Sequence, residues 1–355
     1  MYEIGVLSRW KATCGVSMHA EMIVEEFRRM GHNVRVFAPH VDSANRWWHH
    51  RIIGEDEDFV VRCYDEVDPY GRGGCLDSER ILSNNFDLFI VESYASLPYD
   101  HVERLVRRLR SKGTKVFVVI HEGRREDIGY SSLRIFDALI VFDHRYADML
   151  SCYDITHIVP YPCNPISKSN RRFGEDGIVF FSFGRQPVGE YLDYIRALDW
   201  LSKKYDITYR VIRSDGALPF KKPWLKQEKR RLSNDEVFEM LHKADVHLIP
   251  KGRTNCVVVS STLCQCLGAL ITTVVPNTRH FEILPEYDGF KPAVIYENVE
   301  DLKEKLVRII EDENFRKGVL KAAEMFVNEN RRDKIAKRIL EIFENVQSLL
   351  SIAIS

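Results

Sequence analysis

The sequence predicts an α/β protein built from two doubly wound parallel sheets, and three observations favour this fold class. Short apolar runs alternate with amphipathic stretches along most of the chain, as strands joined by crossover helices do. The chain has 355 residues, which is long enough for two domains with separate cores. A polar, basic stretch at 167–176 divides the apolar runs into two series and is expected to connect the domains.

The first series opens with residues 2–38, which predict a strand, a loop, a helix and a second strand. Apolar side chains recur at helical spacing over 18–30, and Gly31 is a helix stop signal. Gly15 and Val16 lie where the chain enters the helix, so backbone N–H groups and the positive helix end can bind a phosphate there. A glycine at this place also allows a tight turn without any ligand, and both interpretations stay open.

The other elements follow from the same alternation. Further strands of the first series are expected at 88–92, 116–120, 138–142 and 158–159, with a helix over 99–112. The second series predicts strands at 177–183, 209–212, 246–249, 269–275 and 293–296, and helices at 191–203, 235–243, 260–267 and 298–311. Residues 41–85, rich in Asp, Glu, Trp and His, are expected to form loop excursions from the first series, and 313–350 is expected to be helical.

Two doubly wound domains place a ligand crevice between them, at the carboxyl ends of both sets of strands. The loops expected to line this crevice each follow a predicted strand, and they come after Leu7, Glu92, Ile120, Phe183, Ile249 and Val275. Every candidate catalytic or phosphate-binding residue in this sequence belongs to one of these loops.

Composition excludes several classes of protein. The formal net charge of −1 argues against nucleic acid as an obligatory partner. No apolar run approaches the roughly 20 residues that span a bilayer, and the sequence begins without a signal-peptide pattern. The 8 cysteines are scattered without the spacing of a metal knuckle, so we expect free thiols, no metal site and a cytoplasmic location.

Several short motifs follow one another in order over roughly 280 residues. They lie at predicted strands and helix starts, and they comprise 14–16, 31–34, 86–91, 115–121, 136–141, 158–160, 183–185, 232–237, 244–250, 268–271 and 282–284. In this order and spacing they resemble the motifs of GT-B glycosyltransferases, and they are most similar to those of the retaining glycosyltransferase family 4.

The resemblance implies a GT-B fold, in which two Rossmann-like doubly wound domains face an interdomain crevice. It implies an acceptor domain at 1–165, a nucleotide-sugar donor domain at 166–332, and a C-terminal helix at 333–355 that crosses back to the first domain. It further implies a hexosyltransferase-like enzyme that moves a sugar from a nucleoside-diphosphate sugar to a hydroxyl acceptor with retention. The nucleotide sugar is then a substrate, and no cofactor is expected.

The sequence departs from the family pattern in the donor domain. Family 4 enzymes usually carry a lysine a few residues after the arginine that corresponds to Arg185, but 186–190 contains none. The family also has two glutamates separated by seven residues, and the corresponding positions here hold no carboxylate. These positions are Asn255 and Leu263, or Thr254 and Thr262 if the alignment slips by one residue.

His121 is the candidate catalytic residue. It follows five apolar residues at the end of a predicted strand, so its imidazole is expected to point into the crevice. A neutral imidazole there can accept a hydrogen bond from a sugar hydroxyl or orient an acceptor hydroxyl. The alternative is a histidine that ends a strand for packing reasons. The nearby Glu122 and Glu126 are as compatible with solvated side chains as with a role in the site.

The candidate donor site combines Arg185 with the loop 251–255. A guanidinium after the first strand of the second domain can bind a diphosphate through two hydrogen bonds, although a salt bridge across the loop is the alternative. Lys251, Gly252, Arg253, Thr254 and Asn255 supply two cations and a flexible backbone, and 256–267 is expected to turn helical. This loop would compensate for the missing lysine, so that no metal ion is needed; an ordinary solvated basic turn is equally compatible with the residues.

The helix predicted at 99–112 is basic on its polar face, through Arg104, Arg107 and Arg108. Such a face can rest on anionic lipid at the inner side of a membrane, as a lipid-linked acceptor would require. It is also the pattern of a solvated face with paired charges.

Two functions of different class therefore stay open. The leading hypothesis is a metal-independent glycosyltransferase. The alternative is a non-catalytic GT-B relative that binds a sugar or nucleotide as a scaffold, which the absence of the family's lysine and glutamates favours. Epimerisation of a nucleotide sugar has no feature in its favour.

Overall fold

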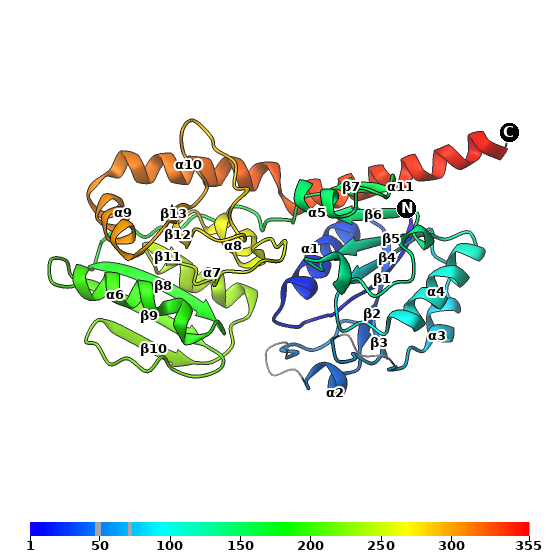
Figure 1. The fold of residues 1–355 in the computed structure, drawn as a ribbon, viewed down its shortest axis with the longest axis horizontal. Coiled ribbons are helices and arrows are strands. Elements are labelled where there is room, and N and C mark those ends of the chain that lie inside the picture. The colour runs from blue at the N-terminus through cyan, green and yellow to red at the C-terminus, as the bar shows by residue number, and fades with distance from the viewer. Residues whose placement is uncertain (47–50, 70–72, 355) are drawn as a thin grey trace. The chain divides into compact units, whose positions relative to one another are not determined.

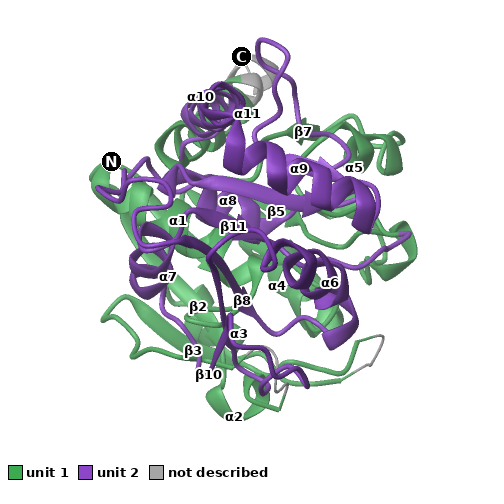
Figure 2. Cartoon of the chain, turned by 90° about the vertical axis from the view of Figure 1, so that its left-hand side faces the viewer, with its two compact units in different colours: residues 1–162, 256–258, 332–355 green, residues 163–255, 259–331 purple. Residues whose placement is uncertain are grey.

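The computed structural model describes residues 1–46, 51–69 and 73–354 (Figure 1). The chain divides into two compact units, which Figure 2 distinguishes by colour. Unit 1 comprises 1–162, 256–258 and 332–355, and unit 2 comprises 163–255 and 259–331.

The core of unit 1 is a parallel sheet, which has seven strands within the described residues, in the order β3-β2-β1-β4-β5-β6-β7. The strands are β1 (Glu3–Leu7), β2 (Asn33–Pro39), β3 (Val60–Tyr64), β4 (Leu88–Ser93), β5 (Lys115–Ile120), β6 (Ala138–Val141) and β7 (Thr156–Ile158). The chain moves outward from β1 through β2 to β3 and then returns to the other side of β1 at β4. This reversal makes the carboxyl ends of β1 and β4 the expected place for a ligand.

Helices connect the strands of unit 1. They are α1 (Gly15–Arg29), α2 (Val41–Ala44), α3 (Ser78–Leu82), α4 (Tyr99–Ser111) and α5 (His144–Met149), with short 3₁₀ turns at Arg125–Asp127 and Leu133–Ile135. In α4 the buried side chains recur at helical spacing, and they are Val102, Leu105, Val106 and Leu109.

The C-terminal helix α11 (Arg332–Ile354) is part of unit 1, where it packs against α1. Phe343 is fully buried, and its ring meets the Tyr2 ring edge to face with 5.0 Å between centroids. At the start of the helix, Arg332 forms ion pairs of 2.7 Å with both Glu25 and Glu26 of α1. Apolar burial along the helix and two ion pairs at its start therefore attach α11 to this unit.

Unit 2 contains a second parallel sheet, six-stranded in the described part of the chain, in the order β10-β9-β8-β11-β12-β13. Its strands are β8 (Ile178–Gly184), β9 (Ile207–Arg213), β10 (Leu225–Lys229), β11 (Val246–Leu248), β12 (Thr272–Pro276) and β13 (Val294–Tyr296). Its helices are α6 (Leu192–Leu201), α7 (Asn234–His242), α8 (Ser261–Cys266), α9 (Val299–Glu311) and α10 (Glu313–Glu329), with 3₁₀ turns at Val188–Tyr191 and Leu267–Ala269. Here the strand order reverses between β8 and β11.

Alternation along β8 shows why this sheet is covered on both faces. Ile178 and Phe180 belong to one apolar cluster, whereas Val179 and Phe181 belong to a second cluster. Successive side chains of a strand point to opposite faces, so each face has its own apolar layer. This burial on both sides is what a near-continuous apolar run in a parallel sheet predicts.

The predicted α/β fold class is confirmed, and two strands correct the prediction in detail. Residues 41–85 are not only loops, because they contain β3, which pairs with β2 from Val36 and Val60 onward, as well as α2 and α3. Strand β10 was also not predicted. Both are edge strands with polar or charged residues among the apolar ones, so they lack the continuous apolar pattern of a central strand.

All 8 cysteines are free thiols, as the sequence predicts. Among the described helices, none has both the length and the apolar character that crossing a bilayer requires.

Candidate functional site

A cluster of three titratable side chains lies at the carboxyl edge of the unit 1 sheet. Glu92 is the next-to-last residue of β4, and His121 directly follows the adjacent strand β5. His19 comes from the second turn of α1. Because parallel strands end at the same edge of a sheet, β4 and β5 deliver their terminal side chains to one place, and α1 adds the third.

Glu92 is bonded to both imidazoles. Its Oε1 lies 2.8 Å from His19 Nδ1, and its Oε2 lies 2.6 Å from His121 Nε2. The side chains of His19 and Glu92 have no exposed surface, and that of His121 is 11% exposed. The two imidazole rings meet edge to face, with 5.5 Å between centroids. Of the three side chains, only that of His121 reaches the surface of unit 1.

Burial and the neighbouring charges act on this cluster in opposite directions. Burial alone would raise the pKa of Glu92, but the two histidines outweigh it and hold the pKa at about 2. Burial lowers the pKa of His121, with Glu92 opposing this shift and His19 and Arg9 adding to it. The cluster therefore consists of an ionised carboxylate beside a histidine that favours its neutral form.

These three residues are also one of two groups among the described residues that bring three possible metal ligands together. The nitrogen–oxygen separations of 2.6 and 2.8 Å are hydrogen-bond lengths. Ligand atoms on a tetrahedral zinc ion, with bonds of about 2.0–2.1 Å, lie about 3.3 Å apart. The geometry is thus that of imidazole N–H groups donating to a carboxylate. In the second group, His40, Asp65 and Cys75, the Cys75 thiol already donates to Asp65 at 2.9 Å.

A second buried carboxylate, Glu122, follows His121. Its Oε1 accepts hydrogen bonds from Ser93 Oγ at 2.5 Å and from Tyr99 OH at 2.6 Å, and burial raises its pKa. Its Oε2 is buried and has no partner among the described residues. Glu122 is therefore not a solvated side chain, whereas Glu126 is exposed.

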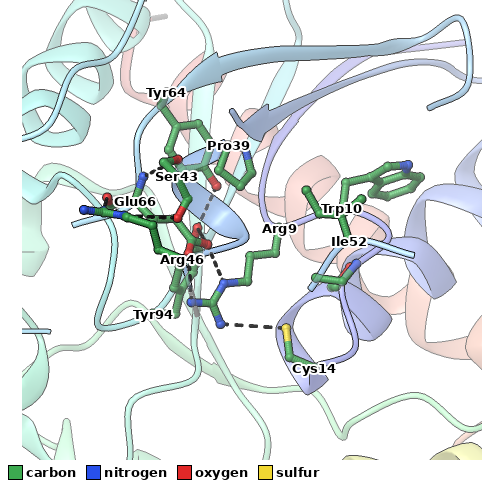
Figure 3. Close-up of polar contacts among 12 residues, drawn as sticks. Arg9, Trp10, Cys14, Pro39, Ser43, Arg46, Ile52, Tyr64, Glu66 and Tyr94 are labelled. Atoms are coloured by element: carbon green, nitrogen blue, oxygen red, sulfur yellow. Dashed lines mark hydrogen bonds and ion pairs between the residues drawn. The ribbon is translucent and has the colours of Figure 1, made fainter. Parts of the chain in front are cut away.

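The loop after β1 is held by a buried ion pair that Figure 3 draws in detail. The Arg9 guanidinium donates to Glu66 through Nε at 2.5 Å and Nη2 at 3.3 Å, and it lies 4.3 Å above the Tyr94 ring. Tyr94 OH also donates to Glu66, at 2.9 Å, and Arg9 Nη1 contacts Cys14 Sγ at 3.8 Å. These contacts fasten the β1 loop, the end of β4 and the start of α1 to one another.

Helix α1 begins at Gly15, as the sequence predicts, and Val16 lies in its first turn. The preceding loop has less free backbone than a phosphate-binding loop requires, because Lys11 N–H donates to Glu21 at 3.0 Å and Ala12 N–H donates to Ser17 Oγ at 2.9 Å. Cys14 caps the helix without a side-chain hydrogen bond. The part of this region that fits an anion is therefore the first turn of α1.

In unit 2, adjacency of β8 and β11 brings two cations to one edge. Arg185 directly follows β8, and Lys251 lies three residues after β11. Burial lowers the pKa of Lys251, while Glu190 opposes the shift and Arg185 adds to it, so Lys251 lies close enough to both charges to be affected by them. Glu190 lies against Gly252 so closely that a Cβ at that glycine would come within 2.5 Å of Glu190 Oε1.

The rest of the loop 251–255 is more open, with Arg253 and Asn255 exposed and Thr254 half-buried. Helix α8 begins at Ser261, which agrees with the helix predicted at 260–267, whereas 256–260 does not turn helical as expected. Ser260 Oγ already accepts a hydrogen bond from Leu263 N–H, at 3.2 Å. A helix N-terminus therefore does not lie in the loop 251–255, because α8 begins ten residues beyond Lys251.

Known proteins share the fold of this chain but little of its sequence. No protein-family model matches the sequence. The structure is similar to that of a glycosyltransferase from Rickettsia africae, with a TM-score of 0.64 and 12% identity over 98% of each chain. Sucrose-phosphate synthase from Thermosynechococcus elongatus gives a TM-score of 0.66 at 11% identity, covering 98% of this chain and 100% of that one. HepE from Anabaena, in complex with UDP and glucose, also gives 0.66 at 11% identity, covering 97% and 100%.

This chain has the GT-B fold. The two parallel sheets, each with one reversal of strand order, are the two Rossmann-like halves that the resemblance implied. At such low identities the similarity concerns the fold, and the chemistry of this GT-B protein has to be argued from its own side chains.

The predicted site residues fall into two groups, one in each unit of the GT-B fold. Gly15, Val16 and His121 belong to unit 1, and the Arg185 and 251–255 group belongs to unit 2. Three further residues emerge only from the structure, namely His19, Glu92 and Glu190. Glu92 ends an apolar run and could have been noticed, whereas nothing in the sequence distinguishes His19 from any other helical histidine.

The basic face of α4 is largely paired within unit 1. Arg107 bonds to Glu103 at 2.8 Å, and Arg108 bonds to Glu79 at 2.6 Å. Arg104 is exposed. The pairing fits a solvated face, and membrane contact stays a prediction.

We predict that replacing Glu66 with Ala destabilises the protein by about 3–5 kcal/mol, because Arg9 would remain buried without a carboxylate. The measurement is the free energy of unfolding in urea. The double variant Arg9→Met, Glu66→Leu removes both charges and should regain most of the loss. Equal losses in the two variants would show that packing, rather than the unpaired charge, causes the effect.

Proposed function

We propose that the protein is a glycosyltransferase that moves a sugar from a nucleoside-diphosphate sugar to a hydroxyl acceptor. One observation carries the proposal: two cations, Arg185 and Lys251, meet at the reversal of strand order in unit 2. Ligands of doubly wound sheets bind at this place. HepE, which shares the fold, is known in complex with UDP and glucose.

The donor half of the site would act through charge. Arg185 and Lys251 can bind a diphosphate through charge-assisted hydrogen bonds, and they can stabilise the negative charge that develops on it as the sugar leaves. Glu190 offsets one of these two charges, so the group keeps one net positive charge for an anion. Three further residues of the same loop, the exposed Arg253 and Asn255 and the half-buried Thr254, extend the proposed donor site.

In unit 1, His121 is proposed as the catalytic residue, with Gly15 and Val16 as a second place for the donor phosphates. The support for His121 is that its ring is the exposed end of an otherwise buried polar cluster. The support for Gly15 and Val16 is the uncapped first turn of α1, which carries the positive end of the helix dipole.

Retention of configuration and independence from metal ions are part of the proposal. Retention rests on the similarity of the sequence motifs to family 4. Independence from metal ions rests on Arg185 and Lys251, which would neutralise the leaving diphosphate as a divalent ion does in other transferases. A cytoplasmic location is proposed from the free thiols. Peripheral membrane contact through Arg104, Arg107 and Arg108 is proposed from the basic face of α4, in which Arg107 and Arg108 are paired with glutamates.

A binding or scaffold role is the second candidate function. The observation in its favour is that the positions of the two family glutamates hold Asn255 and Leu263, or Thr254 and Thr262. A carboxylate near the donor sugar is thus absent from the sequence at these positions, while the cations that bind a diphosphate are present. Such a protein would bind a nucleotide sugar and leave it intact.

Incubation with a panel of nucleoside-diphosphate sugars, with and without EDTA, separates these functions. An enzyme should release the nucleoside diphosphate slowly by hydrolysis even without its acceptor, and EDTA should leave the rate unchanged. Binding in calorimetry without any release would favour the scaffold. Loss of activity in EDTA would contradict independence from metal ions.

Replacing Arg185 with Ala should weaken UDP binding by about 1.5–3 kcal/mol, because a charge-assisted hydrogen bond to the diphosphate is lost. Isothermal titration calorimetry measures this change. Arg308→Ala on α9, which removes an exposed arginine elsewhere in unit 2, is the matched control. Equal affinity of the Arg185 variant and the control would place the donor site elsewhere.

The affinity for UDP should also fall as the pH rises through the lowered pKa of Lys251. Burial lowers the pKa of Lys251, so this cation loses its proton at a lower pH than an exposed lysine does. The diphosphate binds the protonated form, so affinity is highest below this pKa and decreases as the pH rises through it. Calorimetry across this range should show a flatter profile for Lys251→Arg, whose guanidinium stays charged. Identical profiles would remove Lys251 from the site.

A further inference from the structure

The hydrogen bonds of Glu92 determine where the protons of two histidines lie. Glu92 is ionised, so neither of its oxygens has a proton to donate. His19 Nδ1 and His121 Nε2 each lie within hydrogen-bond distance of one oxygen, at 2.8 and 2.6 Å. Each of these nitrogens must therefore carry the proton of its bond.

A neutral imidazole has one N–H, so the opposite nitrogen of each ring carries a lone pair. In His19 this atom is Nε2, which is buried and has no partner among the described residues. In His121 it is Nδ1, for which the described part of the chain supplies no hydrogen-bond partner. His19 and Glu92 have no exposed surface, so His121 alone can present an acceptor nitrogen to a ligand.

We propose that Glu92 and His19 are positioning residues, which hold His121 in the Nε2–H tautomer so that its Nδ1 accepts a hydrogen bond from a substrate hydroxyl. This inference rests on the proposed glycosyltransferase function. It names the atom through which His121 acts and assigns a role to two residues outside the predicted site. The bond orients the hydroxyl, and no proton is transferred.

His19 contributes by fixing the carboxylate. With His121 as its only donor, Glu92 could rotate and offer either oxygen. His19 occupies Oε1 from a helix that is anchored to the sheet, so that Oε2 faces His121. The ring of His19 also packs edge to face against His121 and Phe142, at 5.5 and 5.4 Å between centroids. The hydrogen bonds to Glu92 and the ring packing together fix the orientation of the His19 and His121 rings.

Burial supports the neutral state that this assignment needs. A protonated His121 would carry N–H groups on both nitrogens, which would turn Nδ1 from an acceptor into a donor. Burial lowers the pKa of His121, and the charge of Arg9 acts in the same direction, while Glu92 opposes the shift. The acceptor form is thus the form favoured at neutral pH.

Nitrogen-15 NMR of the imidazoles tests the tautomers without any substrate. Signals of the two rings are assigned from their loss in His19→Asn and His121→Gln. We expect His19 as the Nδ1–H tautomer and His121 as the Nε2–H tautomer at neutral pH. A His121 ring that carries its proton on Nδ1, or on both nitrogens, would overturn the proposal whatever the protein's activity.

The kinetic test uses a substitution of His121 that keeps a nitrogen at the position of Nε2. His121→Gln retains an N–H donor for Glu92, but its one acceptor, the amide oxygen, does not occupy the position of Nδ1. It should keep the wild-type unfolding midpoint and UDP affinity while turnover of the donor sugar falls by at least ~100-fold. His101→Gln on α4 is the matched control and should leave turnover unchanged. Unchanged turnover in His121→Gln would overturn the role of Nδ1.

Glu92→Gln links the tautomer to the activity. An amide offers one oxygen and one NH₂, so one of the two imidazoles has to move its proton to the other nitrogen. If NMR shows that His19 changes and His121 does not, turnover should be kept; if His121 changes, turnover should be lost. Either mismatch between tautomer and turnover would overturn the positioning role. A wild-type protein that turns over no sugar donor would refute the proposed function, and the NMR result would still decide the tautomers.

Discussion

Every candidate functional side chain in this protein depends on one constraint, that parallel strands end together at one edge of their sheet. The order of strands reverses between β1 and β4 in unit 1 and between β8 and β11 in unit 2. Connections on the two sides of a reversal diverge, which leaves room for a ligand between them. Glu92 and His121 occupy such an edge in one unit, and Arg185 and Lys251 occupy it in the other.

Burial of charge is the second determinant, and it explains why the unit 1 edge is rigid. The carboxylates Glu66, Glu92 and Glu122 are all buried, and each accepts at least two hydrogen bonds from side chains. The pKa values of Glu92 and Glu122 shift in opposite directions, because Glu92 faces two imidazoles whereas Glu122 is bonded by neutral groups, including the hydroxyls of Ser93 and Tyr99. Neutral hydroxyls donate hydrogen bonds to a buried carboxylate without compensating its charge. Burial therefore determines the raised pKa of Glu122, whereas in Glu92 the two histidines outweigh burial and lower the pKa.

The sequence was sufficient to predict the central strands and the place of His121 at the end of one of them. It was insufficient to predict contacts between residues that are distant along the chain. A central parallel strand is buried on both faces, so 116–120 is apolar throughout and its end is visible at His121. The edge strands β3 and β10 face solvent and carry polar residues, so no such pattern marks them. His19 is separated from Glu92 by 73 positions, and its spacing in α1 gives no sign of the carboxylate that it meets. Likewise nothing in the sequence shows that 256–258 belongs to unit 1, so the expectation that the helix reaches back to 256 was wrong.

The free-energy cost of burying Glu92 with His19 and His121 bears on whether the protein is an enzyme or a binding module. A buried carboxylate with two imidazoles is usually no more stable than apolar side chains of similar volume, since desolvation offsets much of the attraction. His19 adds to this cost, because its Nε2 is buried without a partner in the described structure. A module that only held a nucleotide diphosphate would need the cations of unit 2 and would gain nothing from this arrangement. The cluster does have a use where a sugar hydroxyl must be held in one orientation. Glycosyl transfer and the binding of an intact nucleotide sugar both require this, so the cluster argues against a module that binds the nucleotide alone.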